Sequence, residues 1–205
     1  NFPFTKDLGE ELKNLFDEYE ADFTEMYEQM KTLPSALARL EKTGIVTKEQ
    51  ASSIGTVGVS AKMSGILRDI RATHPHDLYE KMNHEPITKN HGDVYSRTQI
   101  RREEILQSME YIRNMLKNIP QENTNRKELK SPVPDSFSLS LVEGWRGEIC
   151  HCAITDGKSE LAHYKVKDPS MHNWLALALA VRNNEISDFP ICNKSFDLSY
   201  CGHDL

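Results

Sequence analysis

Two long stretches in which apolar residues recur at steps of three and four constrain the fold of this chain more than any other feature. The recurring residues of the first stretch are Leu8, Leu12, Leu15, Phe16, Tyr19, Phe23, Met26, Tyr27 and Met30. The second stretch covers residues 93–118, with the same spacing from Ile100 to Leu116. Because one helical turn takes about 3.6 residues, both stretches predict long amphipathic helices that face a core. Asp7, followed by Glu10, is the candidate cap of the first helix.

The rest of the chain divides into shorter elements. A short helix is expected at 35–42, and residues 54–65 read as irregular, with glycines that let a backbone approach a neighbour closely. After a polar, proline-containing stretch the spacing changes to alternation, in "SFSLSLVEGW" and "GEICHCAITDGKSELAHYKVKD". This alternation predicts antiparallel strands, with a hairpin turn at Asp156-Gly157. Asp168-Pro169 opens a last helix that is apolar nearly all round and is therefore expected to be buried.

Together these elements predict an α+β fold. The fold is mainly a helical bundle, with a small antiparallel β-hairpin or sheet near the C-terminus. We expect a single domain over residues 1–205, helical in 1–120, with the hairpin and the C-terminal helix in 131–205.

Composition excludes several functional classes. The formal net charge of −6 disfavours nucleic acid as a partner, because nothing neutralises a run of phosphates. The longest apolar run, Trp174–Val181, is far shorter than the roughly 20 residues of a membrane helix. Four cysteines without regular spacing favour reduced thiols of an intracellular protein. No signal segment is visible, and a start at Asn1 without methionine suggests part of a longer chain.

Common catalytic and metal motifs are missing from the sequence. Cys192, Cys201 and His203 lie near the end of the chain, but their spacing departs from that of structural zinc sites. There is no G-x-S-x-G nucleophile elbow, and "GTVGVSAKMSG" lacks the G-K-[ST] of a P-loop. These absences leave a folded α+β chain with no activity assigned by motif alone.

Three segments resemble one superfamily in order and spacing. "SGILRDIRATHPHDLYE" (64–80) is similar to S-G-x-x-x-D-x-R-x-x-x-P-x-x-x-Y, and "GDVYSRTQIRREEILQS" (92–108) to G-D-x-x-x-R-x-x-x-R-x-x-E. "EGWRGEICH" (143–151) resembles E-x-P-R-G-E-x-x-H, with Trp145 in the proline place. These are motifs of the large subunit of nickel–iron hydrogenases and of the quinone-site subunit of respiratory complex I. The resemblance runs from about Gly44 to the end and implies the C-terminal half of such a subunit.

The resemblance also bears on the C-terminal tail. Hydrogenases of this superfamily end in D-P-C-x-x-C-x-x-R/H, whose thiolates hold nickel. In "DLSYCGHDL" Asp197 takes the aspartate place, while Ser199 and Gly202 fall where the two cysteines belong and Cys201 is one residue off. The resemblance therefore implies a membrane-bound, hydrogenase-related type that lacks the metal-ligand cysteines.

The implied function is that of a large-subunit fragment in a membrane-associated, energy-converting oxidoreductase complex. Such a subunit takes part in electron transport, lines a redox or quinone-type pocket and holds no cofactor itself. The iron–sulfur cluster belongs to a partner small subunit, and the other implied partners are further subunits of the complex, quinone and, in the whole complex, NAD. The implied location is the cytoplasmic side, peripheral to the inner face of the cell membrane, and the fragment alone would be inactive. The alternative is a non-catalytic scaffold or assembly subunit that kept the fold but lost metal and substrate.

The candidate pocket residues follow from the matched motifs and the tail. They are Asp69, Arg71, His74, Asp77, Asp93, Arg97, Glu143, Arg146, His151, Ser199, Cys201 and His203. One interpretation is a charged network that orders a pocket or relays protons. The other is a set of ordinary salt bridges that tie the irregular segment to the long helix. For His74 the alternative is an ordinary solvated loop residue.

We also expect the tail, residues 193–205, to lie inward against residues 64–77. Burial of Phe196 favours this arrangement, since a buried aromatic side chain contributes on the order of 1.5–3 kcal/mol. The tail carboxylates would then need partners, and the candidates are Arg68, Arg71 and Arg97. The alternative is a frayed chain end.

A first prediction concerns the metal. Protein purified from metal-supplemented cells should contain no stoichiometric nickel, because neither Ser199 nor Gly202 supplies a thiolate. Elemental analysis checks this directly. One nickel per chain would contradict the placement of these two residues.

Overall fold

The computed structural model describes residues 5–117 and 131–200, apart from the side chain of Asp77. The chain forms two compact units. The first comprises residues 1–38 and 102–129, and the second residues 39–101 and 130–205.

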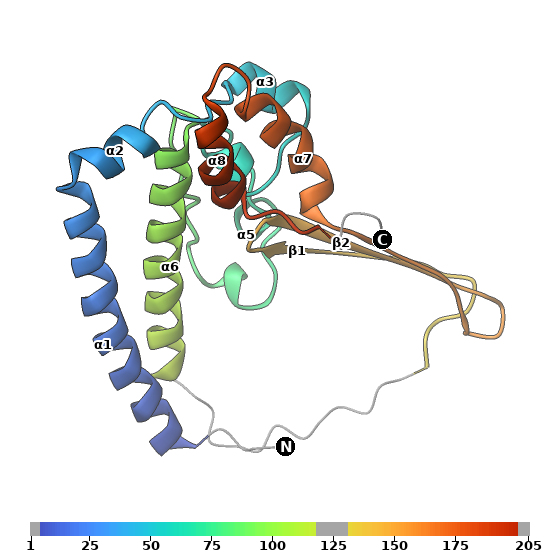
Figure 1. Ribbon diagram of the computed structural model, residues 1–205. Helices are drawn as coiled ribbons and strands as arrows, with labels where there is room; N and C mark the ends of the chain where they lie inside the picture. The colour runs from blue at the N-terminus through green and yellow to red at the C-terminus, as the bar shows by residue number, and fades with distance from the viewer. Residues whose placement is uncertain (1–4, 118–130, 201–205) are drawn as a thin grey trace. The chain divides into compact units, whose positions relative to one another are not determined.

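The first unit is built from helices. It contains α1 (Lys6–Lys31), most of α2 (Pro34–Leu40) and the C-terminal part of α6 (Val94–Leu116). This part of α6 lies alongside α1 (Figure 1). Arg113 bridges the two helices by ion pairs of 2.8 Å to Asp17 and 2.5 Å to Glu20. The two long predicted helices are confirmed.

Two details of α1 differ from expectation. The hydroxyl of Thr5, and not Asp7, caps the helix by accepting a hydrogen bond of 3.2 Å from the backbone of Leu8. The apolar stripe is only partly covered, since Leu15 is 56% and Met26 61% exposed. The stripe was expected to face a core, but within this unit α6 contacts only part of it. Several apolar side chains of α1 therefore lie on the surface of the unit.

The second unit combines short helices with a sheet. Its helical segments are α3 (Lys48–Ser53), α4 (Val59–Lys62), α5 (Ile70–Thr73), η1 (Asp77–Glu80), the first turns of α6, α7 (Pro169–Ala180), η2 (Ile186–Asp188) and α8 (Phe189–Phe196). The sheet has three antiparallel strands in the order β1 (Phe137–Gly144), β2 (Gly147–Thr155) and β3 (Leu161–Lys167). The strands extend away from the helices of this unit (Figure 1). The predicted α+β class is confirmed.

The turns of the sheet follow from its sequence. Gly144 pairs with Gly147, so Trp145 and Arg146 form a two-residue turn between β1 and β2. The predicted turn at Asp156-Gly157 joins β2 to β3, where the Asp156 carboxylate accepts backbone hydrogen bonds of 2.9 Å from Lys158 and from Glu160.

Helix α7 begins as the sequence predicts but is not wholly buried. Asp168 caps it, with a carboxylate oxygen that accepts a hydrogen bond of 2.6 Å from the backbone of Ser170. One face, including Ala176 and Leu177, is buried, whereas Leu175 is 53% exposed. The prediction of full burial was wrong because the outer face of the helix has no neighbouring element among the described residues of this unit.

The irregular segment before α4 approaches the β1–β2 turn closely, as its glycines predict. Gly58 has a φ of 58°, and a Cβ on it would lie 2.4 Å from the carbonyl oxygen of Arg146. Asn173 on α7 fixes this contact. Its amide accepts a hydrogen bond of 3.1 Å from the backbone of Val57 and donates to the carbonyls of Val57 and Arg146, both at 3.2 Å. The turn is thereby held against the helical part of the unit.

None of the helices in the described part of the chain is long and apolar enough to cross a membrane.

Replacing Asn173 tests this contact. Asn173→Ala leaves the buried amide of Val57 without its acceptor, so we expect a loss of about 2–3 kcal/mol in the free energy of unfolding. The matched control is Asn114→Ala, because Asn114 is exposed and its side chain accepts a hydrogen bond from the exposed Lys117. Urea denaturation should show a change below about 0.5 kcal/mol for the control. Equal effects of the two variants would contradict the structural role of Asn173.

Candidate functional site

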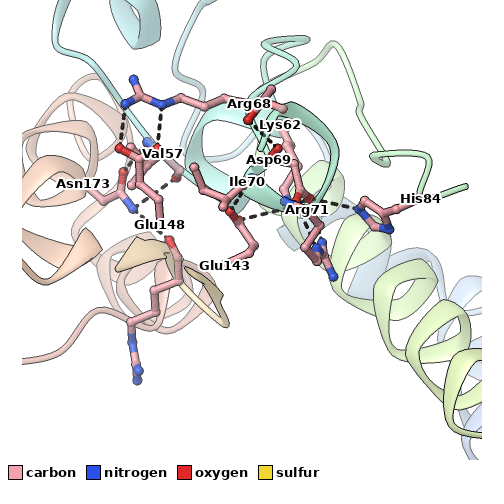
Figure 2. Close-up of polar contacts among 12 residues, drawn as sticks. Val57, Lys62, Arg68, Asp69, Ile70, Arg71, His84, Glu143, Glu148 and Asn173 are labelled. Atoms are coloured by element: carbon pink, nitrogen blue, oxygen red, sulfur yellow. Dashed lines mark hydrogen bonds and ion pairs between the residues drawn. The ribbon is translucent and has the colours of Figure 1, made fainter. Parts of the chain in front are cut away.

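A buried carboxylate, Asp69, is the centre of the candidate site (Figure 2). It caps α5, where its extended backbone lets the side chain accept a hydrogen bond of 3.0 Å from the amide of Arg71. The Arg71 guanidinium donates two more, of 2.9 and 2.7 Å. Lys62 Nζ lies 3.2 Å and His84 Nε2 3.3 Å from the same carboxylate. Asp69 therefore has basic groups from three segments of the chain around it.

The protonation of Asp69 follows from these contacts. Its side chain and that of Lys62 are almost completely buried, at 0% and 1% exposure. Burial by itself disfavours the carboxylate, but the hydrogen bonds from Arg71 and His84 and the charges of Lys62 and Arg71 outweigh it. They hold the pKa of Asp69 well below its usual range. Asp69 is thus a fixed negative charge.

Glu143, the next-to-last residue of strand β1, is a second buried carboxyl in this network. Its side chain is 5% exposed, and Oε2 accepts a hydrogen bond of 3.1 Å from the backbone of Ile70. Oε1 lies 3.8 Å from Lys62 Nζ and has no hydrogen-bond partner among the described residues. Burial, together with the neighbouring charge of Asp69, outweighs the attraction of Lys62 and raises the pKa of Glu143 to about 7. Two carboxyl groups in one network therefore have opposite pKa shifts.

Glu148 adds a third carboxyl on the same side of the hairpin. It is the direct cross-strand partner of Glu143, so their side chains leave the same face of the sheet. Arg68 binds Glu148 in a bidentate pair of 3.1 and 2.6 Å, and Lys167 lies 4.0 Å away. Lys62 and Arg68, which belong to one short segment, thus face the two opposed carboxyls of the hairpin.

Asp93 and Arg97 form a second cluster. Asp93 Oδ1 accepts hydrogen bonds from Ser96 at the start of α6, and Oδ2 accepts one of 2.9 Å from the backbone of Lys42. Arg97 is fully buried; burial lowers its pKa to about 9, so it stays charged at neutral pH. The Arg97 guanidinium donates to the carbonyls of Gly44 and Gly92, each at 3.1 Å.

The C-terminal tail is held at the β1–β2 turn. Phe196 is buried, as predicted, and its ring lies 4.2 Å from the guanidinium carbon of Arg97. The Asp197 carboxylate accepts a hydrogen bond of 3.0 Å from the Trp145 indole and lies 3.6 Å from Arg146, which also donates to the Asp197 carbonyl.

These contacts correct the expected partners of the tail. Asp197 pairs with Arg146 and not with Arg68, Arg71 or Arg97, because those three arginines already bind acceptors elsewhere.

The structure brings together only some of the predicted residues. Asp69, Arg71 and Glu143 share the first network, and Asp93 and Arg97 belong to the second cluster. Arg146 lies at the tail, where the backbone of Ser199 donates a hydrogen bond of 3.0 Å to the hydroxyl of Ser170.

The remaining predicted residues lie elsewhere or outside the description. His151 bonds Tyr164 at 2.5 Å on an exposed part of the sheet, and the exposed His74 bonds Thr73 at 3.1 Å. The side chain of Asp77 and the whole of Cys201 and His203 lie outside the described residues.

Sequence reasoning missed Lys62 and His84. Lys62 lies two residues before the first matched motif, and the available signal was a single lysine within the mostly small and apolar segment 59–65. His84 lies in "KMNHEP", where neither spacing nor charge marks it.

Within residues 5–117 and 131–200, no three His, Cys, Asp or Glu side chains are grouped to hold a metal ion.

Comparison with known proteins adds an independent observation. The sequence family described as "Respiratory-chain NADH dehydrogenase, 49 Kd subunit" matches residues 3–138. The carbon monoxide-induced hydrogenase of Rhodospirillum rubrum is 30% identical over 167 residues, which are 82% of this chain and 46% of that protein. An NADH-quinone oxidoreductase subunit from Dehalococcoides mccartyi strain 195 is 29% identical over 203 residues, which are 95% and 54% of the two chains. Hydrogenase-4 component G of Escherichia coli K12 is 28% identical over 186 residues, 91% of this chain and 30% of the relative. This chain thus spans about half the length of these relatives, or less.

The pKa of Glu143 predicts a pH-dependent stability. A carboxyl whose folded-state pKa is raised stabilises the fold below its unfolded pKa, and this stabilisation is lost as pH rises through about 7. Glu143→Gln removes this dependence. Relative to the wild type, the variant should gain on the order of 1 kcal/mol between pH 6 and pH 8.

Urea denaturation at both pH values measures this difference. Glu148→Gln is the control, because it removes the ion pair with Arg68 at both pH values. A Glu143→Gln variant whose stability follows the wild type over this range would contradict the raised pKa.

Proposed function

Because the chain belongs to the family of the respiratory-chain NADH dehydrogenase 49 Kd subunit, within the nickel–iron hydrogenase and complex I superfamily, we propose that it works as part of a membrane-associated, energy-converting oxidoreductase complex. In this proposal the chain is a large-subunit portion that lines a redox pocket for a quinone or another acceptor. The redox centre is an iron–sulfur cluster of a partner subunit, on the cytoplasmic face of the membrane. NAD belongs to the assembled complex and not to this chain.

The observation that carries the proposal is the network around Asp69. Residues from two of the three matched motifs, Asp69 and Arg71 from the first and Glu143 from the third, meet in one buried cluster. Buried charges are costly, and a fixed carboxylate beside a carboxyl of raised pKa is typical of sites that handle protons or polar substrates. Asp93 and Arg97, from the remaining motif, form the second cluster, which lies in the same unit.

The donor set of the tail does not fit a nickel–iron centre. Ser199 supplies a hydroxyl where a soft thiolate is needed, and its backbone is bound to Ser170. Asp197 accepts a hydrogen bond from Trp145 and lies beside Arg146, and these contacts hold the tail at the β1–β2 turn. No step of the proposed function therefore passes through nickel.

The exposed apolar residues of helix α1 support the presence of a partner subunit. Leu15, Tyr19 and Met26 are each more than half exposed, and large apolar side chains in such a row are typical of surfaces that subunits cover. The proposal assigns this role to other subunits of the complex.

Isolation of the complex through a tag on this chain tests the proposal. Iron–sulfur protein should co-purify, and membranes should transfer electrons to a quinone or another acceptor. Asp69→Asn should lower this activity at least 10-fold, because the cations of the site lose their fixed counter-charge. Iron per purified complex shows whether the variant still assembles, and Asp17→Asn, which alters an exposed ion pair, is the control.

Two outcomes would contradict the proposal. A tagged chain that brings no iron–sulfur protein would refute the assignment to a complex. Full activity of an assembled Asp69→Asn complex would instead favour the scaffold alternative.

A further inference from the structure

Asp69 and Glu143 lie near the same cations, and Asp69 makes more and closer contacts with them. Asp69 accepts hydrogen bonds from Arg71 and Lys62, and His84 lies within hydrogen-bond distance. Glu143 has one backbone donor, Ile70, and Lys62 Nζ stays 3.8 Å from its Oε1. When two carboxyls share a limited set of cations, the one with fewer donors keeps a proton more easily.

The groups that face Glu143 come from three directions. Lys62 approaches from α4, while Asp69 and Arg71 approach from the start of α5. Across the hairpin the neighbour is Glu148, whose charge is matched by Arg68. Lys62 is shared with Asp69, so no cation in the described structure belongs to Glu143 alone.

Oε1 of Glu143 is the atom where a proton would sit. It is buried and lacks a hydrogen-bond donor among the described residues. An ionised oxygen without donors is costly in such surroundings, whereas a neutral hydroxyl is much less so. Oε2 keeps its hydrogen bond from Ile70 in either state.

We propose that Glu143 is a proton-exchanging residue, and that Lys62 and Asp69 set its proton affinity. An O–H bond forms at Oε1 when the proton arrives from water or from a protic molecule in the site, and it breaks when the proton returns. No electron moves in this step. The added proton neutralises Glu143, so the net charge of the network rises by one and the charge–charge attraction between Glu143 and Lys62 is lost.

This inference goes beyond the proposed function and does not require it. In an oxidoreductase, reduction of an organic acceptor such as a quinone consumes protons, and Glu143 would exchange them inside the protein. The proton exchange itself is a property of this chain and is measured without any partner.

Carbon-13 NMR of protein labelled at the glutamate carboxyl carbons measures the exchange. The signal that disappears in Glu143→Gln belongs to Glu143, and in the wild type it should titrate with a midpoint near pH 7. Lys62→Gln removes a nearby positive charge, so the midpoint should rise by about one pH unit or more. Asp69→Asn removes a negative charge and should lower it. Lys117→Gln, the same change at an exposed lysine, is the control and should leave it unchanged.

Once Glu143→Gln has assigned the signal, the wild-type titration decides the proposal even where Lys62→Gln or Asp69→Asn does not fold. A Glu143 midpoint below about pH 5, close to that of ordinary glutamate, would overturn the proposal. So would a midpoint that stays the same in folded Lys62→Gln and Asp69→Asn proteins. Circular dichroism at each pH verifies that the titrating protein is folded.

Discussion

The buried guanidinium of Arg97 is the interaction on which the second unit depends. It joins the loop at Gly44, the loop at Gly92 and helix α8, where it donates a hydrogen bond of 2.8 Å to Ser195. A buried cation is tolerated when its donors are satisfied, and here two backbone carbonyls and the Ser195 hydroxyl supply acceptors. Glycine is required at position 44, because a Cβ would lie 2.9 Å from the guanidinium and 2.6 Å from the Cys192 sulfur.

In the candidate site, burial changes the protonation of carboxyl groups, whereas around Arg97 it encloses a charged group with satisfied donors. The carboxyls of the site differ in protonation because hydrogen-bond donors are divided unequally between them. Asp69 receives nearly all of them and is held ionised, whereas Glu143 receives one backbone amide and has a raised pKa. One lysine, Lys62, touches both. The site therefore keeps a permanent charge and a titratable one within a single network.

Much of this arrangement was predictable from the sequence, because apolar periodicity and the order of short motifs can be recognised in a single sequence. The two long helices, the hairpin at Asp156-Gly157 and the superfamily were predicted and are confirmed, whereas the short helix α4 lies in a segment that was expected to be irregular. The partner of Asp197 was not, because spacing along the chain does not reveal which arginine is already bound to other acceptors. Lys62 and His84 were missed for a related reason, since their role arises only when distant segments pack together. The exposed face of α7 was also missed, because its composition does not show which face is covered.

The pairing of Glu143 with Glu148 has a consequence for how the second unit folds. Two like charges opposite one another weaken a hairpin, and a two-stranded hairpin alone is at best marginally stable. The cations that relieve this repulsion, Lys62 and Arg68, lie about 80 residues earlier in the chain. The β1–β2 hairpin should therefore become stable only after it docks on the segment that contains them. Such long-range dependence makes folding slower than in a local hairpin, and it makes the segment and the hairpin one cooperative unit.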